Sequence, residues 1–464
     1  MCGGSFTSPA VPAPTGRGAV PFPAWFAAPV TGEPQRPLST GHLVRLVVPA
    51  LLVGVLCALT LVALSALATW IQDLVWDRLP TAWGLATTET WWTVLVLTLT
   101  GLLVGATIRW APGHAGVDPA TTDLVTAPLP LRALPGLAVA LVLGLAGGVS
   151  LGPENPIIAI NVALTAWILC RPRLGVPVQG AVGLAMSATI GAMFATPLAA
   201  ALVLTETFAE GGDRTGPLFD RLFGPLVAAG AGAVTMVALE APTFAVDLPA
   251  YPGVHVGDVL SAAVVAVVAA VLTLLVVLAF PFVHRFFHGL RHPVLALGLG
   301  GLVLGLLGVL GGPLTLFKGL DQMKELSADA ADMTWTAILV LALVKLAALL
   351  VAAGAGFRGG RIFPAVFVGV AVGFAASSLV PSVPAAVAVS AAVLGTVIVV
   401  GRSGWLALFM AAVVVNDARL IPALCIAIVP LWLVVRSMPP LRVEPPAGGA
   451  PEFAAVASRE RGVA

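Results

Sequence analysis

The sequence predicts an all-α, polytopic membrane protein built from two similar halves that contain broken and re-entrant helices. Three observations predict this fold class: an apolar composition, a set of charge-free runs and an internal repeat. Hydrophobic residues make up 59% of the 464 residues, and charged residues make up only 10%. Because a soluble domain carries about 25% charged residues, this chain is too apolar to cover a water-facing surface. We therefore expect most of it to lie in a lipid bilayer.

Charge and cysteine content exclude several other classes of protein. Lys and Arg number 23, and Asp and Glu number 22, so the net charge of +1 provides no basic field for nucleic acid. The four cysteines lie far apart, and we interpret them as small core residues rather than as a disulfide framework or a metal site. The composition thus excludes a soluble enzyme, a nucleic-acid binder and a secreted disulfide module.

Composition divides the chain into five segments. Residues 1–41 are rich in Pro and Gly and predict a disordered N-terminal tail, without the uninterrupted apolar stretch of a signal peptide. Residues 439–464 predict a second disordered tail. Between the tails we expect a first membrane repeat over 42–241, an inter-repeat loop over 242–254 and a second membrane repeat over 255–438.

The charge-free runs indicate where the chain crosses the membrane, since a helix needs about 20 apolar residues to do so. Six runs have a suitable length: 46–72, 90–108, 133–153, 222–239, 259–284 and 292–317. Residues 155–170 and 403–416 are too short to cross, whereas 174–205 and 362–401 are too long for one helix and contain Gly or Pro breakers. Irregular backbone at membrane depth is tolerated only where it is buried or lines a polar cavity. These four runs therefore predict broken or re-entrant helices.

The internal repeat places similar breaks in both halves. Residues 148–164 and residues 354–370 each contain a Gly-rich stretch, a proline and a following apolar run. A second break follows in each half, at 195–197 and at 402–404. Interrupted segments at matching places in two halves are typical of a transporter site at the interface between the halves. A chance similarity between two Gly-rich stretches is the alternative.

The first Gly/Pro break carries a candidate anion site with an acid beside it. In Gly152-Pro153-Glu154-Asn155-Pro156, Gly and Pro end one helix, and Pro156 suits the first turn of the next. The first amides of that helix lack intrahelical partners and attract anions. A carboxylate at membrane depth is a functional candidate, and Glu154 is suited to occupy the place of the anion and to leave when it is protonated. A capping glutamate in an interfacial loop is the alternative.

Two further loops have related chemistry. In Gly359–Pro364, glycines allow close approach of the backbone, and the amides of Ile362 and Phe363 are free to point at the same ion. A plain interhelical loop is the alternative. The loop Pro112–Pro119 also breaks a helix, and we interpret its His114 as a hydrogen-bonded loop residue rather than a ligand.

Other ionisable residues have less specific patterns. Three histidines follow one another at i, i+4 and i+8 spacing: His284, His288 and His292. Because basic residues lie beside them and Pro293 follows, we interpret them as a wet, cytoplasmic helix end rather than a metal site. Lys345 lies within an apolar run and must find a partner or a cavity.

Together these motifs resemble the CLC family of chloride channels and proton-coupled anion transporters, over roughly residues 42–440. The gating motif G-R-E-G-P is matched by 152–156, and the first anion loop G-S-G-I-P is loosely matched by 113–118. The motif A-P-L-x-G-x-x-F-x-x-E-E is resembled by 196–207, and G-x-F-x-P by 360–364. More narrowly, the chain is similar to a divergent bacterial branch of ion-channel or ion-transport proteins.

The resemblance implies a CLC-like inverted repeat, a homodimer with one pore per subunit, and Glu154 as the gate. It implies anion coordination by six residues: Ala115, Gly116, Val117, Asn155, Ile362 and Phe363. It also implies no cofactor, no metal and no enzymatic activity, with a small inorganic anion, protons and the lipid bilayer as partners.

Several residues depart from the family pattern. Ala115 has no hydroxyl group at the serine position of the first loop, and the only tyrosine, Tyr251, lies mid-chain rather than near the C-terminus. Pro153 replaces the arginine of the gating motif. Thr207 stands where proton-coupled members have an inner glutamate, so Glu206, one position earlier, is the candidate for a proton pathway.

We therefore expect a channel or proton-coupled exchanger for chloride or another halide, in the cell membrane. Basic residues at loop ends, such as Arg45 and Arg285, predict that both termini are cytoplasmic. A secondary transporter of organic anions on an unrelated inverted-repeat fold is the alternative. An intramembrane enzyme is a third class, but it needs a nucleophile–base pair or metal ligands at membrane depth, and the sequence shows neither pattern.

Overall fold

The computed structural model describes residues 39–84, 89–122, 127–171, 176–210, 217–239, 244–249, 251, 253 and 255–443. In this part of the chain the structure is built from helices, and eight of them are long and apolar enough to cross a membrane. One isolated antiparallel bridge joins Gly152 to Gly360. The predicted tails 1–38 and 444–464 lie outside the described residues.

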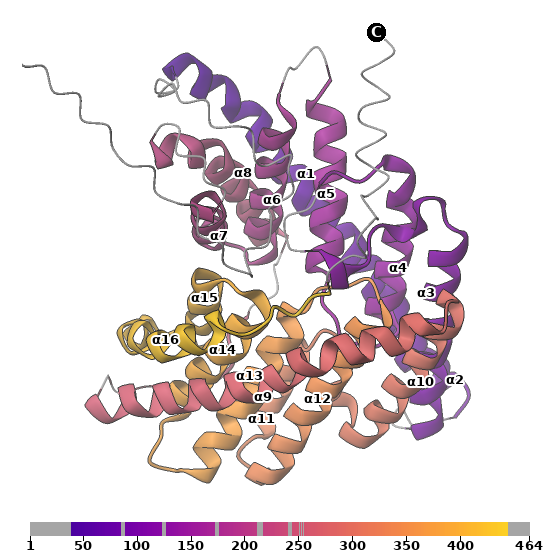
Figure 1. Cartoon of the computed structure of the whole chain (residues 1–464), viewed down its shortest axis with the longest axis vertical. Helices are drawn as coiled ribbons and strands as arrows, with labels where there is room; N and C mark the ends of the chain where they lie inside the picture. The colour runs from indigo at the N-terminus through magenta and orange to yellow at the C-terminus, as the bar shows by residue number, and fades with distance from the viewer. Residues whose placement is uncertain are drawn as a thin grey trace, which may run out of the picture.

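The helices form two series that follow each other along the chain (Figure 1). The first series is α1 Thr40–Asp73, α2 Leu79–Ala82, α3 Thr90–Trp110, α4 Leu134–Ala146, α5 Glu154–Leu169, α6 Val178–Met193, α7 Pro197–Glu210 and α8 Leu218–Ala238. The second is α9 Val256–Gly289, α10 Pro293–Gly311, α11 Leu320–Asp329, α12 Trp335–Ala355, α13 Ile362–Leu379, α14 Ala385–Gly401, α15 Gly404–Val415 and α16 Ile421–Arg436. Short 3-10 turns join several of them, including Pro112–Ala115 and Pro119–Thr121.

The predicted broken helices are confirmed. Both runs that looked too short form short helices, since α5 has 16 residues and α15 has 12. Both runs that looked too long divide, the first into α6 and α7 and the second into α13 and α14. Left-handed residues mark the second break of each half, with φ of 52° at Ala195 and 54° at Arg402. Each series thus begins with a long helix of 34 residues, α1 in the first and α9 in the second, and shorter helices follow it.

Two of the predicted membrane runs differ from the structure. The run 133–153 is no single span, because α4 ends after 13 residues. Two glycines end it: a Cβ on Gly147 would lie 2.1 Å from the Thr100 hydroxyl, and Gly148 has a φ of +88°. The run 292–317 likewise ends as helix at Gly311.

The ends of the membrane region also differ from the prediction. Helix α1 begins at Thr40, inside the segment assigned to the N-terminal tail. Residues 439–443 were assigned to the C-terminal tail, but the backbone N–H of Val443 donates to the carbonyl of Ala120 at 2.9 Å. The Arg361 side chain donates to the carbonyls of Leu441 and Pro119. The chain after α16 therefore contacts both the loop after α3 and the start of α13.

Close helix packing depends on small residues. A Cβ on Gly101 of α3 would lie 2.0 Å from the carbonyl oxygen of Leu297 on α10, and a Cβ on Gly301 would lie 2.2 Å from that of Leu97. Helices in lipid associate through such close contacts, since lipid is as apolar as the side chains and provides no hydrophobic drive. The same kind of contact seats Gly373 of α13 against Val389 of α14. Helices α13 and α14 are consequently buried along most of their length.

Lys345 on α12 is fully buried and finds the partners that the sequence required. Its ammonium donates to three consecutive backbone carbonyls, those of Thr315 at 3.0 Å, Leu316 at 2.7 Å and Phe317 at 2.7 Å. The amide of Phe317 in turn donates to the carbonyl of Gly148 at 3.0 Å. Lys345 therefore holds the loop after α10 against the segment that leads into α5.

We predict that Lys345→Met destabilises the protein by about 3 kcal/mol, because it leaves three buried carbonyls without their charged donor. Thermal unfolding in detergent measures this change as a lower Tm. Lys324→Met, the same substitution at a half-buried lysine on α11, is the control and should shift Tm much less. Equal Tm values for the two variants would contradict the role given to the Lys345 ammonium.

Candidate anion site

The starts of two short helices meet at a buried carboxylate. Helix α5 begins at Glu154, and helix α13 begins at Ile362. The Glu154 side chain is fully buried, and its Oε1 accepts a hydrogen bond of 2.8 Å from the backbone N–H of Phe363. The amide of Ile362 also interacts with this carboxylate. Amides in the first turn of a helix lack intrahelical partners, so the Glu154 carboxylate satisfies a donor that would otherwise be available to an anion.

A short backbone bridge fixes the two helix starts against each other. The N–H of Gly152 donates to the carbonyl of Gly360 at 2.8 Å, and the N–H of Gly360 donates to the carbonyl of Gly152 at 2.6 Å. A Cβ on Gly360 would lie 1.9 Å from Oε2 of Glu154, and one on Gly152 would lie 2.2 Å from it. While the Glu154 carboxylate is seated, neither position has space for a side chain.

The second carboxylate oxygen is in a different environment. Oε2 of Glu154 is buried, and no described residue donates a hydrogen bond to it. A buried carboxylate oxygen without a donor costs free energy. The arrangement is thus a backbone donor at one helix start, bonded to one oxygen of a carboxylate from the other helix start, with the second oxygen unbonded.

The sequence-predicted anion residues divide into two groups. Ile362 and Phe363 lie at the Glu154 carboxylate, and Asn155 is the next residue on α5, half-buried. In the other group, Ala115 is fully buried and Val117 is 41% exposed.

The loop of this second group makes a different contact. Arg358, between α12 and α13, donates to the carbonyls of His114, Ala115 and Gly116 at 3.0 to 3.3 Å. In the described structure the hydrogen bonds of this loop thus lead to Arg358 and not to Glu154. His114 is a hydrogen-bonded loop residue as predicted, since its Nδ1 lies 3.0 Å from the carbonyl oxygen of Ile108.

A cluster of phenylalanines adjoins the site, and the sequence analysis missed it. The ring of Phe363 lies 6.3 Å from that of Phe194, at the end of α6, and 5.4 Å from that of Phe244. Phe409 of α15 lies 5.6 Å from Phe194. Phe194 directly precedes the break at Ala195. Its position beside a broken helix is the one sequence feature that could have indicated this cluster. These rings pack together around the Phe363 side chain.

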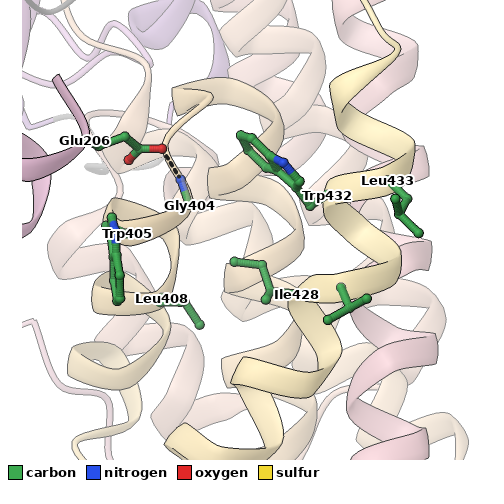
Figure 2. Close-up of a pocket in the computed structure, with 8 residues that line it drawn as sticks. Glu206, Gly404, Trp405, Leu408, Ile428, Trp432 and Leu433 are labelled. Carbon is green, nitrogen blue, oxygen red and sulfur yellow. Dashed lines mark hydrogen bonds between the residues drawn. The ribbon is translucent and has the colours of Figure 1, made fainter. Parts of the chain in front are cut away.

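Glu206, the candidate for the proton pathway, lies elsewhere. Its carboxylate accepts hydrogen bonds from the hydroxyl of Ser403 and from the N–H of Gly404 at 3.1 Å, at the start of α15. It lines a cavity of about 400 Å³ together with Trp405 and Trp432 (Figure 2). None of the hydrogen bonds described for Glu206 reaches Glu154.

The interpretation of the three histidines needs a correction. His292 is exposed, as expected for a wet helix end. The His284 side chain, however, is only 12% exposed, because its Nε2 lies 3.2 Å from Oδ2 of Asp118 in the loop after α3. His288 makes the same contact at 3.1 Å. The sequence could not show this pairing, since Asp118 is far away along the chain.

Two halves with matching broken helices, which meet around a buried carboxylate at membrane depth, define a membrane transport protein of the inverted-repeat class. The model of the family described as voltage gated chloride channel matches residues 100–430. The chain therefore belongs to the voltage gated chloride channel family, as the sequence motifs indicated.

Relatives of known name agree with this assignment. The "Putative ion-transport protein YfeO" of Escherichia coli (strain K12 / DH10B) is 48% identical over 398 residues, which cover 86% of this chain and 94% of the relative. The protein of the same name from Escherichia coli O1:K1 / APEC is 49% identical over 395 residues, covering 85% of this chain and 94% of the relative.

Solved structures share the fold at low sequence identity. A CLC-type fluoride/proton antiporter has a TM-score of 0.71 at 17% identity, and the match covers 87% of this chain and 98% of the antiporter. A slow cyanobacterial Cl−/H+ antiporter has a TM-score of 0.68 at 17% identity, covering 92% of this chain and 99% of the antiporter. The predicted CLC-like, inverted-repeat membrane fold is confirmed.

We predict that Gly360→Ala expels the Glu154 carboxylate from the site, because the new methyl group would overlap Oε2. The Phe363 amide then loses its acceptor, and hydrogen–deuterium exchange of the peptide that contains it should become faster. Gly144→Ala on α4 is the control, since an added Cβ there meets no atom within 4 Å. Unchanged exchange at Phe363 in the Gly360 variant would contradict the described seat of Glu154.

Proposed function

We propose that this protein moves small monovalent anions, chloride or another halide, across the membrane, and that Glu154 gates their path. The observation that carries the proposal is the bond from the Phe363 amide to the fully buried Glu154 carboxylate. The ion-transport name of the relatives supports transport, and the titles of the two antiporter structures support an anion as its substrate.

The site would bind an anion without using a cationic side chain. The first turns of α5 and α13 place free amides and the positive ends of two helix dipoles at one point. A halide bound there would accept the N–H of Phe363 in place of the carboxylate. Glu154 is then a tethered competitor, which the covalent chain keeps at high local concentration while it is ionised.

Protonation of Glu154 would weaken its competition with the halide. A neutral carboxyl group has little attraction to helix dipoles, and Oε2, which no described residue bonds, is the oxygen open to a proton. Once the Glu154 side chain leaves the site, only backbone atoms of residues 152 and 360 line the space that it occupied, because both residues are glycine. Low pH should therefore open the path, and high pH should close it.

Selectivity would rest on the backbone amides. Ala115 offers no hydroxyl group, and Tyr251 lies in a loop where its own hydroxyl donates to Asp258 at 2.5 Å. Amide donors bind any small anion that fits, so size and dehydration would decide which halide is preferred. The Phe194, Phe244 and Phe363 rings border this space and limit its width.

We also propose Glu206 as the inner proton carrier. It is a carboxylate inside a membrane helix that borders a cavity, and such groups commonly relay protons. Its two hydrogen bonds at the start of α15 hold the carboxylate beside this cavity. Thr207, which replaces the inner glutamate of the family pattern, has a hydroxyl bonded to the carbonyl of Val203 and has no ionisable group.

The family resemblance further supports a homodimer in the cell membrane with both termini in the cytoplasm. Large apolar side chains are exposed on α8 and α16, such as Phe219 at 66% and Leu433 at 68%. In a bilayer these side chains would face either lipid or a second copy of the chain.

Glu154→Gln should remove the pH dependence of anion flux and leave the path open, because glutamine keeps the shape of the side chain but carries no charge to compete with a halide. The measurement is efflux of chloride, fluoride and nitrate from proteoliposomes with simultaneous recording of pH. Glu325→Gln on the exposed face of α11 is the matched control and should behave as the wild type. Wild-type flux at every pH in the Glu154 variant would refute the gate.

Glu206→Gln should abolish proton movement coupled to anion flux while passive anion flux persists, because the inner carboxylate could no longer carry a proton. The same proteoliposomes report it as a lost pH change with retained halide efflux. Wild-type coupling in this variant would rule out Glu206 as the carrier. Competition of the flux by organic anions, with no effect of halides, would instead favour an organic-anion transporter.

A further inference from the structure

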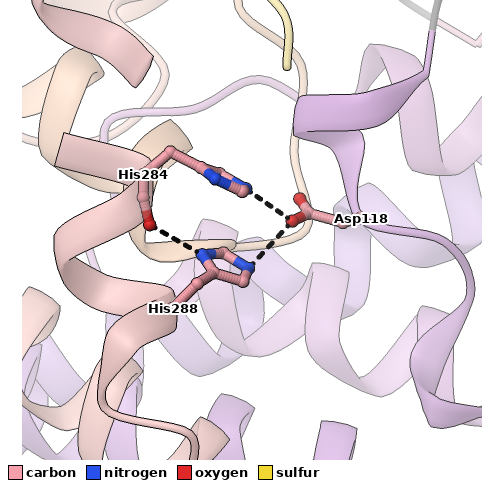
Figure 3. Close-up of side chains that lie close together, drawn as sticks. All are labelled: Asp118, His284 and His288. Atoms are coloured by element: carbon pink, nitrogen blue, oxygen red, sulfur yellow. Dashed lines mark hydrogen bonds and ion pairs between the residues drawn. The ribbon is translucent and has the colours of Figure 1, made fainter. Parts of the chain in front are cut away.

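Asp118, His284 and His288 form a compact cluster that makes no described contact with Glu154 (Figure 3). Oδ2 of Asp118 lies 3.2 Å from Nε2 of His284 and 3.1 Å from Nε2 of His288. The two histidines are one helical turn apart at the end of α9, and Asp118 comes from the loop after α3. Their exposure rises from 12% for His284 through 20% for Asp118 to 45% for His288, so the cluster opens to solvent on one side.

The outward-facing atoms of the cluster are already bonded. Oδ1 of Asp118 accepts the N–H of Ala120 at 2.9 Å and lies 3.9 Å from Nη1 of Arg358. Nδ1 of His288 lies 3.0 Å from the carbonyl oxygen of His284, which only accepts, so Nδ1 must carry the proton. In a neutral ring this leaves the Nε2 lone pair facing Oδ2 of Asp118 at 3.1 Å. The positive charge between these two atoms is then either a proton on Nε2 or a metal ion.

Arg358 contacts the other oxygen of the Asp118 carboxylate. Its Nη1 lies 3.9 Å from Oδ1, whereas both histidine nitrogens lie against Oδ2.

We propose that Asp118, His284 and His288 bind a divalent transition-metal ion, with Zn²⁺ as the preferred ion. Bonds of about 2.0–2.1 Å to zinc place neighbouring ligand atoms about 3 Å apart, which is the separation found at both Asp118–histidine pairs. Two histidines and one carboxylate are a common zinc set, with water as the fourth ligand. The carbonyl behind His288 and the amide behind Asp118 are the outer partners that orient such ligands.

One movement is needed for coordination. The imidazole rings stack with centroids 3.8 Å apart and planes 19° apart, so their Nε2 lone pairs run nearly parallel. A shared ion requires one ring to turn toward the other, and His288, the most exposed of the three, has space to do so.

A bound ion would link the two halves of the protein. The ligands join the loop after α3, in the first half, to α9, in the second. Arg358 holds the same loop and lies two residues before Gly360 of the bridge. Zinc should therefore stabilise the contact between the halves near the anion site. This inference concerns binding and does not rest on the proposed function.

The test is isothermal titration of ZnCl₂ into the full chain in detergent, purified with a tag that contains no histidine and stripped with EDTA. We expect one zinc ion per chain and a rise in Tm on binding. His288→Ala, at the most exposed ligand, should weaken zinc binding by about 100-fold or more, and Asp118→Asn should do the same. His292→Ala, an exposed histidine four residues further along, is the matched control and should bind zinc as the wild type does.

Three results would overturn the proposal. The first is a wild-type chain that binds zinc no better than the His288 variant. The second is an equal loss of zinc binding in the His292 variant, which would show adventitious binding to surface histidines. The third is a Tm that responds to pH through His288 but not to zinc, which would make the cluster an ion-pair network. Gel filtration of each variant establishes that it is folded, so a lost site is distinguished from a lost fold.

Discussion

A backbone donor cannot be left without a partner in a membrane, and this constraint determines the centre of the structure. Each unsatisfied N–H or C=O group costs several kcal/mol in hydrocarbon. Helices α5 and α13 both start inside the protein, so their first amides need acceptors there. The Glu154 carboxylate accepts the N–H of Phe363, and the Gly152–Gly360 bridge pairs the backbone that precedes both helices. Each half thus provides hydrogen-bond partners for the other.

The rest of the fold keeps this meeting point enclosed. Long helices such as α1 and α9 surround the short ones, and the contacts of Gly101 and Gly301 bring α3 and α10 close enough to exclude lipid from between them. Lys345 applies the same principle to a loop, because one buried ammonium satisfies three carbonyls at once.

Local chemistry made much of this predictable from the sequence. Gly and Pro beside Glu154 and before Phe363 indicated two helix starts, and the matching breaks indicated two halves that meet. The length of α4 was not predictable from apolar character, because the helix ends where Gly147 packs closely against Thr100 of α3 and Gly148 has a positive φ. The pairing of Asp118 with His284 crosses 166 positions and has no periodic signature, so only the folded chain reveals it. The Phe194–Phe363 contact was hidden for the same reason.

The short stretch after α16 has a mechanical consequence. Its Leu441 and Val443 are bonded to Arg361 and Ala120, so the stretch joins the residue preceding α13 to the loop after α3. Arg361 is followed directly by the two amides that face Glu154. A displacement of residues 441–443 would therefore pull on the Arg361 side chain, and through it on the start of α13 that contacts Glu154.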